Sequence, residues 1–134
     1  MAVATTGQKT ILVIEDDPWT RTITTALLAG EGFAVVEAKN GEEGLTKARH
    51  HTPDAILLDL ALPTKSGLEV LRELKSERPT AGIPVIIVSA YGTLMNEHDA
   101  HQAEGVIQKP FDYDDLVGQV ERATARSLVE VALT

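Results

Sequence analysis

The sequence predicts an α/β fold in which helices cover both faces of a five-stranded parallel sheet, the doubly wound arrangement. Short apolar runs rich in valine and isoleucine recur without alternation, as expected of strands buried on both faces. Segments with helical spacing of apolar residues separate these runs. Right-handed crossovers would then bring the carboxyl ends of all strands to one edge, where ligands bind in such folds.

Each apolar run predicts one strand. The five predicted strands cover residues 11–14, 33–36, 55–58, 85–88 and 106–107.

The first predicted helix begins at Pro18, which suits a first helical turn, and ends at Gly30 or Gly32. Apolar residues at helical spacing define its buried face, so Trp19 is expected to pack this helix against the rest of the fold. The residues predicted on this face are Trp19, Ile23, Ala26 and Leu27.

Four more helices are predicted. The second covers residues 42–50, and the third carries leucines at 68, 71 and 74, with Pro79 beyond its end. A fourth, around residues 93–103, has a weak pattern. The fifth begins near Asp112, which is expected to form its N-cap, and has Leu116, Val120 and Ala123 at helical spacing.

Length and composition indicate one globular domain: 134 residues, 43% hydrophobic. We expect a flexible tail at residues 1–9, the domain at 10–126, and an extension of the last helix or a tail at 127–134. The net charge of −8 argues against nucleic acid or a membrane surface as the main partner. There is no cysteine, no signal-peptide pattern and no membrane-spanning run, so a cytoplasmic location is expected.

Polar residues follow four of the predicted strands. Glu15 and Asp16 follow the first, Asp59 the third, Ser89 the fourth and Lys109 the fifth. Carboxylates that crowd together repel each other and need a cation, and Mg²⁺ takes oxygen ligands. Asp59 could then act as a nucleophile toward phosphorus, with Lys109 and Ser89 holding phosphoryl oxygens. The predicted edge therefore suits phosphoryl transfer.

Four motifs in order resemble the response regulator receiver family of two-component signalling. They are residues 11–18, residues 54–63 with Gly67, the pair Ser89-Ala90, and residues 109–111, Lys-Pro-Phe. The resemblance covers residues 10–125 and implies a flavodoxin-like (βα)5 fold with strand order 2-1-3-4-5.

The resemblance implies roles for matching positions. Asp59 would be the phosphoacceptor, Asp16 a direct ligand of Mg²⁺ and Glu15 a ligand often acting through water. The backbone carbonyl of Ala61 would complete the protein ligands, and Mn²⁺ would be a substitute ion. Asp17 is either part of the acidic group or only the cap of the first helix.

The phosphoryl group would be bound by a second set of residues. Ser89 would be the switch hydroxyl and Lys109 the phosphoryl partner, with a cis bond between Lys109 and Pro110. The backbones of Leu60 and Ala90 would contact the phosphoryl group.

The chain departs from the family at several positions. Val106 stands where a switch aromatic is usual, and the segment between Ala90 and Lys109 is about two residues short, which predicts a shortened or irregular fourth helix. Ser66 replaces a common aspartate, with little expected consequence. Ala61 and Tyr91 occupy rate-tuning positions: Ala61 cannot orient water and Tyr91 could cover the phosphoryl group, so a long-lived phosphorylated state is expected.

The predicted function is a signalling switch. A sensor histidine kinase or histidine phosphotransfer protein would phosphorylate Asp59, and a downstream protein would read the changed surface. Homodimers through the fourth and fifth helices are common in the family. No nucleic acid or membrane partner is expected. The protein would not be a conventional enzyme, since it would catalyse only its own phosphorylation and slow autodephosphorylation.

Other readings stay open. The main alternative is a degenerate receiver-like module with constitutive protein contacts. A flavin carrier is disfavoured because a flavin site needs an aromatic crevice and only 4% of the residues are aromatic. An aspartate-nucleophile phosphatase is disfavoured because it needs a second acidic residue at the position of Ala61. His98 and His101 share a helix face, but no matching ligand set accompanies them, so they are expected to be surface histidines.

Overall fold

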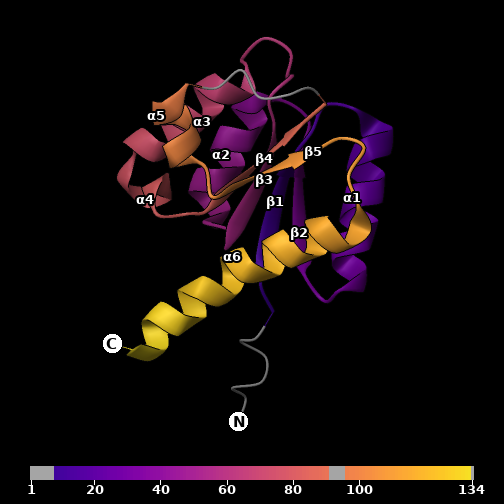
Figure 1. Ribbon diagram of the computed structural model, residues 1–134. Helices are drawn as coiled ribbons and strands as arrows, with labels where there is room; N and C mark the ends of the chain where they lie inside the picture. The colour runs from indigo at the N-terminus through magenta and orange to yellow at the C-terminus, as the bar shows by residue number, and fades with distance from the viewer. Residues whose placement is uncertain (1–7, 91–95, 134) are drawn as a thin grey trace.

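The computed structural model describes residues 8–90 and 96–133, with side chains described to residue 125. Five parallel strands form one sheet in the order β2-β1-β3-β4-β5, as predicted (Figure 1). The strands are β1 (Thr10–Ile14), β2 (Ala34–Ala38), β3 (Ala55–Asp59), β4 (Val85–Ser89) and β5 (Gly105–Gln108).

Helices cover both faces of this sheet. α1 and α6 lie on one face, and the remaining helices lie on the other (Figure 1). Their bounds are α1 (Pro18–Gly30), α2 (Gly41–His51), α3 (Gly67–Ser76), α4 (Arg78–Ala81), α5 (Glu97–Gln102) and α6 (Tyr113–Leu133). None of the described helices is both long and apolar enough to cross a membrane.

The strands are buried because alternate side chains enter two separate cores. Leu12 and Ile56 point toward α2 and α3, while their neighbours Val13 and Leu57 point toward α1 and α6. All five positions of β3 and of β4 are buried. The continuous apolar runs in the sequence therefore reflect burial on both faces.

Most predicted elements are confirmed with small shifts at their ends. β2 begins one residue later than expected and extends to Ala38. Asp112 caps α6 as predicted: its carboxylate accepts a hydrogen bond from the Asp115 amide at 3.1 Å. The fourth predicted helix appears as α5, six residues long, and its expected first residues, 93–95, lie outside the described part of the chain.

One short helix was not predicted. α4 forms directly after α3, with Pro79 in its first turn and no side-chain hydrogen bond at its N-cap. Lys75 holds its end, because the ammonium donates to the carbonyls of Ala81 at 3.1 Å and Ile83 at 2.7 Å. A proline that only marks the end of one helix in sequence here also begins another.

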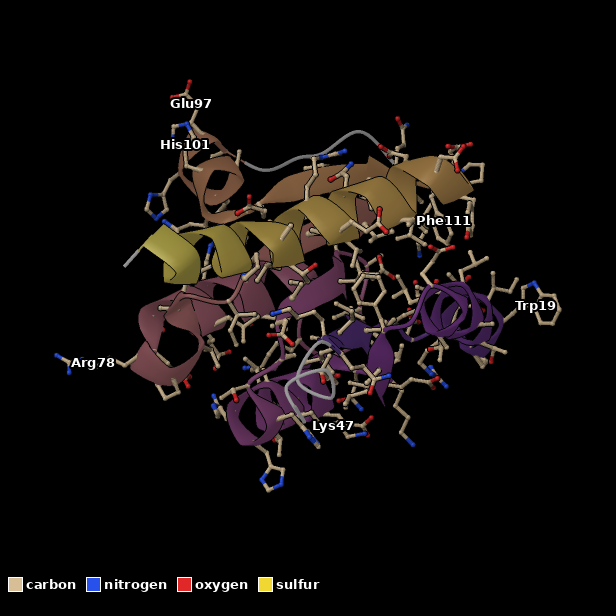
Figure 2. All side chains as sticks on the ribbon, turned by 90° about the horizontal axis from the view of Figure 1, so that it is seen from below. Trp19, Lys47, Arg78, Glu97, His101 and Phe111 are labelled. Atoms are coloured by element: carbon tan, nitrogen blue, oxygen red, sulfur yellow. The ribbon has the colours of Figure 1, made fainter. Side chains whose placement is uncertain are left out.

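The predicted packing of Trp19 is wrong. Its side chain is 72% exposed and points away from the body of the protein (Figure 2). The buried residues of α1 are Thr24 and Leu28, one turn apart, and Trp19 lies about 140° around the helix from Thr24 at the α-helical rotation per residue. Ala26, also placed on the buried face, is exposed.

Candidate functional site

The strand ends bring the predicted acidic residues together. β1 and β3 pair in parallel, with Ile14 opposite Leu58, so Glu15 and Asp59 leave neighbouring strands at the same edge. Three carboxylate oxygens, one each from Glu15, Asp16 and Asp59, lie within 4.8 Å of one another. Glu15 and Asp59 are buried, whereas Asp16 is exposed. We call these three residues the acidic cluster.

The Lys109 ammonium lies against this cluster. It donates to Glu15 at 2.7 Å and to Asp59 at 3.4 Å, so the shorter contact is with Glu15. Lys109 follows β5, and its amide donates to the Ser89 carbonyl at 2.7 Å. The Lys109–Pro110 peptide bond is cis, as the resemblance implied.

Burial and charge set the pKa values of this ion pair. Burial raises the pKa of Glu15, and the hydrogen bonds from Lys109 and from the Asp17 amide lower it only in part. Burial lowers the pKa of Lys109, but its hydrogen bond to Glu15 and the charge of Asp59 outweigh burial, so its pKa is raised overall. The lysine is therefore held as an ammonium beside carboxylates.

The backbone around Asp59 is fixed by the loop that follows β3. The Ala61 amide donates to the Asp59 carboxylate at 3.1 Å, and the Leu60 amide donates to the Val88 carbonyl at 3.3 Å. Gly67 packs against this loop, because a Cβ there would lie 2.3 Å from the Asp59 carbonyl oxygen and 2.5 Å from the Leu60 Cα. Only a residue without a side chain fits this approach.

Ser89 and Ala90 extend from the neighbouring strand. Ser89 ends β4, one position beyond the partner of Asp59 in the β3–β4 register, and is buried. Ala90 is exposed. Tyr91, the second predicted rate-tuning residue, lies outside the described residues.

Asp17 forms the N-cap of α1. Its carboxylate accepts hydrogen bonds from the amide and the hydroxyl of Thr20, both at 2.7 Å, and these bonds lower the pKa of Asp17. Its own amide donates to Glu15 at 3.1 Å. The observed role of Asp17 is therefore to cap α1.

Sequence reasoning missed Arg21. From α1, its guanidinium reaches back to the carbonyls of Glu15 and Asp16. The available sequence signal was that Arg21 follows Asp17 by four residues, about one helical turn. This spacing does not show whether the arginine side chain faces solvent or the end of a strand.

The donor set fits a hard divalent cation. Carboxylate oxygens from three residues, one of them exposed, match the oxygen ligands and retained waters that Mg²⁺ prefers. This is the only group of three or more such side chains with metal-ligand spacing within residues 8–90 and 96–125. His98 and His101 are exposed, as expected of surface histidines.

A groove opens beside Lys109. It runs between α1 and the segment that leads from β5 to α6. Figure 2 shows Phe111 on the same side of the molecule as α1 and Trp19. The residues that line the groove are Thr20, Ile23, Ala90, Lys109, Pro110 and Phe111.

Solved structures of receiver domains superimpose closely on this fold. A CheY-like response regulator receiver domain protein from Methanospirillum hungatei matches with a TM-score of 0.84 at 29% identity, over 92% of this chain and 99% of that one. The receiver domain of sensor histidine kinase PA1611 from Pseudomonas aeruginosa, which has a magnesium ion coordinated in its active site cleft, matches with a TM-score of 0.80 at 26% identity, over 89% and 99%.

Curated relatives agree. The polar-differentiation response regulator DivK of Brucella anthropi is 36% identical over 104 residues, covering 76% of this chain and 85% of that protein. The DNA-binding transcriptional regulator NtrC of Salmonella typhimurium is 36% identical over 115 residues, 84% of this chain, and this chain spans only 24% of its length.

The family pattern described as "Response regulator receiver domain" matches residues 11–121, which contain the whole sheet from Ile11 onward, the acidic cluster and Lys109. The chain belongs to the response regulator receiver family.

Proposed function

We propose that this chain is a phosphorylation-dependent signalling switch in which Asp59 accepts a phosphoryl group. The observation that carries the proposal is the placement of the Asp59 carboxylate, hydrogen-bonded by the Ala61 amide and 3.4 Å from the Lys109 ammonium, within a group of acids. One carboxylate oxygen is held, while the lysine can neutralise an incoming anion.

The donor would be a phosphohistidine on a sensor histidine kinase or a histidine phosphotransfer protein. A carboxylate oxygen of Asp59 forms a bond to phosphorus as the phosphorus–nitrogen bond breaks, and the imidazole leaves with its electron pair. Lys109 and the Ser89 hydroxyl would hold the transferred phosphoryl oxygens, together with the backbones of Leu60 and Ala90.

Mg²⁺, or Mn²⁺ in its place, would be held by Asp16, Asp59 and the Ala61 carbonyl, with Glu15 acting through water. When bound, the ion neutralises phosphoryl charge. Glu15 is paired with Lys109 at 2.7 Å, which supports an indirect contribution from this residue.

Beryllofluoride with Mg²⁺, which mimics a phosphoryl group, tests the proposal. We expect it to bind the wild-type chain, and acetyl phosphate to label Asp59. An Asp59→Asn variant should fold and show neither effect. A wild-type chain that takes up neither reagent would instead support the alternative, a degenerate module with constitutive protein contacts.

The groove beside Lys109 is the proposed docking surface for the phosphodonor. It is lined mainly by apolar groups and leads to the site from α1. Ile23→Glu should retain labelling by acetyl phosphate and lose transfer from a phosphorylated histidine phosphotransfer protein. Ala26→Glu is the matched control, because it adds the same charge to an exposed position of α1 outside the groove lining.

Output would pass through the face formed by α5, β5 and α6. Val106, in place of the usual aromatic, is 41% exposed on β5, so we expect loop and backbone movement rather than a ring to carry the change. A downstream protein or a second copy would read this face. Sizing the chain with and without beryllofluoride separates these partners, since only self-association changes the mass of the isolated protein.

The lifetime of the phosphorylated state is proposed to be long, since Ala61 has no polar group to orient water. Tyr91 is proposed to shield the phosphoryl group. Tyr91→Ala should speed loss of the label, and an unchanged rate would contradict the shielding role.

A further inference from the structure

Arg21 occupies the turn where β1 passes into α1. Its Nη1 donates to the Glu15 carbonyl at 2.8 Å and to the Asp16 carbonyl at 3.3 Å. Its side chain is only 18% exposed, and its amide makes the first helical hydrogen bond to Asp17 at 2.9 Å. The guanidinium is therefore folded back along the helix toward the strand end, not extended into solvent.

A second contact of the guanidinium is made through its Nε atom. Its Nε donates to the Glu37 carboxylate at 3.3 Å. Glu37 lies on β2, opposite Val13 in the β1–β2 register, and its carbonyl accepts a hydrogen bond from Lys47 at 2.6 Å. Arg21 thus joins the edge strand to the turn, using the planar geometry of its donors.

The two carbonyls that Arg21 holds belong to two members of the acidic cluster. The carboxylates of Glu15, Asp16 and Asp59 repel each other across at most 4.8 Å. The turn after β1 could relieve this repulsion by rotating its peptide planes, because Asp16 is exposed and lies beyond the strand. Hydrogen bonds to both carbonyls oppose that rotation, and they fix the direction in which the two side chains leave the backbone.

We propose that Arg21 is a positioning residue for divalent-cation binding: it holds the backbone of Glu15 and Asp16 so that their carboxylates face Asp59. The inference rests on the proposed function, since it takes the acidic cluster to be the Mg²⁺ site. Within the acidic cluster, Arg21 contacts only the backbone carbonyls of Glu15 and Asp16, and it acts on the ion through these two residues.

Electrostatic repulsion alone predicts the opposite effect of removing Arg21 on the affinity for Mg²⁺. A guanidinium beside a cation site repels the cation, so its removal should tighten Mg²⁺ binding if electrostatics dominated. If positioning dominates, removal should weaken binding. The loss of an outer hydrogen-bonding partner of a metal site typically costs about 10- to 100-fold in affinity, so positioning is expected to win.

The experiment is a calorimetric Mg²⁺ titration of the full chain, with Arg21→Met, Arg21→Lys and Glu37→Gln compared with wild type. We expect the dissociation constant to rise by about 10- to 100-fold in Arg21→Met. The dissociation constant of Arg21→Lys should lie between those of wild type and Arg21→Met, because one ammonium cannot reproduce the guanidinium hydrogen bonds to both carbonyls and to Glu37. Glu37→Gln should weaken binding less, since the contacts to the carbonyls remain.

Arg49→Met is the matched control. Arg49 makes a bidentate ion pair with Glu77, at 2.8 and 2.7 Å, between α2 and the start of α4. The substitution is the same, the change in net charge is the same, and an ion pair is lost away from the acidic cluster. It should leave the Mg²⁺ dissociation constant unchanged even where it lowers the melting temperature.

The possible results distinguish the role of Arg21 from the proposed metal site. If wild type binds Mg²⁺ and a folded Arg21→Met binds it equally or more tightly, the positioning role is wrong and the proposed function stands. If wild type does not bind Mg²⁺, the proposed metal site itself is wrong, and the role of Arg21 falls with it. If Arg21→Met does not fold, Arg21→Lys provides the test. A wild-type affinity of Arg21→Lys for Mg²⁺ would contradict the positioning role of Arg21.

Discussion

A methyl group at Gly67 would overlap the backbone that carries Asp59. Its Cβ would lie 2.3 Å from the Asp59 carbonyl oxygen, which is a backbone atom and not the end of a flexible side chain. Gly67→Ala should therefore displace the loop after β3 and cost about 1–3 kcal/mol of unfolding free energy. It should also weaken beryllofluoride binding, because the Ala61 amide would move with the loop. Chemical denaturation and a beryllofluoride titration measure the two effects.

Gly82→Ala is the control for this prediction. A Cβ at Gly82 would have no atom within 4 Å, and the backbone there is right-handed helical. The substitution should be neutral or stabilise the fold by up to about 1 kcal/mol, since alanine restricts the unfolded chain. Equal losses in the two variants would show that the close approach at Gly67 is not what limits the site.

Among elements, α3 begins with a capping box. The Ser66 hydroxyl accepts a hydrogen bond from the Glu69 amide at 3.2 Å, and the Glu69 carboxylate accepts one from the Ser66 amide at 3.4 Å. Ser66→Ala should cost about 1 kcal/mol of unfolding free energy, whereas Ser66→Asp, which can still cap, should cost little. Thermal unfolding of the two variants tests this. A Ser66→Asp variant as unstable as Ser66→Ala would contradict the capping role.

A bidentate ion pair ties α5 to α3. Arg72 donates to the buried Asp99 carboxylate at 3.1 and 2.7 Å, and the hydrogen bond from Arg72 holds the pKa of Asp99 below its ordinary value of 3.8. A lowered pKa means that this contribution to stability is present above the ordinary value and is lost as the pH falls through the folded value. The advantage of wild type over Asp99→Asn should therefore be full at neutral pH and shrink below about pH 3.8.

Melting temperatures of wild type and Asp99→Asn across this pH range check the prediction. Asp114→Asn, at an exposed position of α6, controls for the general loss of an acid. A difference between wild type and Asp99→Asn that persists unchanged to the lowest pH would show that the ion pair does not hold α5.

The elements could be predicted from sequence to different degrees. The strands were predictable because burial on both faces leaves a continuous apolar run, as in β3 and β4. The packed face of α1 was not, since Trp19 fits the helical period with Ile23 and yet lies on the exposed side of the first turn. Periodicity gives the spacing of a face, but the sheet decides which face is covered.

The site shows the same division. Glu15, Asp16, Asp59 and Lys109 could be predicted to converge because parallel strands end at one edge. The preference of Lys109 for Glu15 over Asp59 depends on side-chain geometry, and so does the backward reach of Arg21. Residue spacing alone specifies neither contact.

At the scale of the whole molecule, the net charge of −8 and the acidic cluster both favour cations, so specific binding must be separated from general screening. An ion that binds only the folded state stabilises it by about 2.7 kcal/mol when present at 100 times its dissociation constant. We expect MgCl₂ to raise the melting temperature of wild type more than NaCl of equal ionic strength, and EDTA to reverse the rise. Asp16→Asn should respond equally to the two salts, because screening remains while the exposed ligand is lost. A wild-type protein that responds equally to both salts would mean that its acidic groups act only through their summed charge.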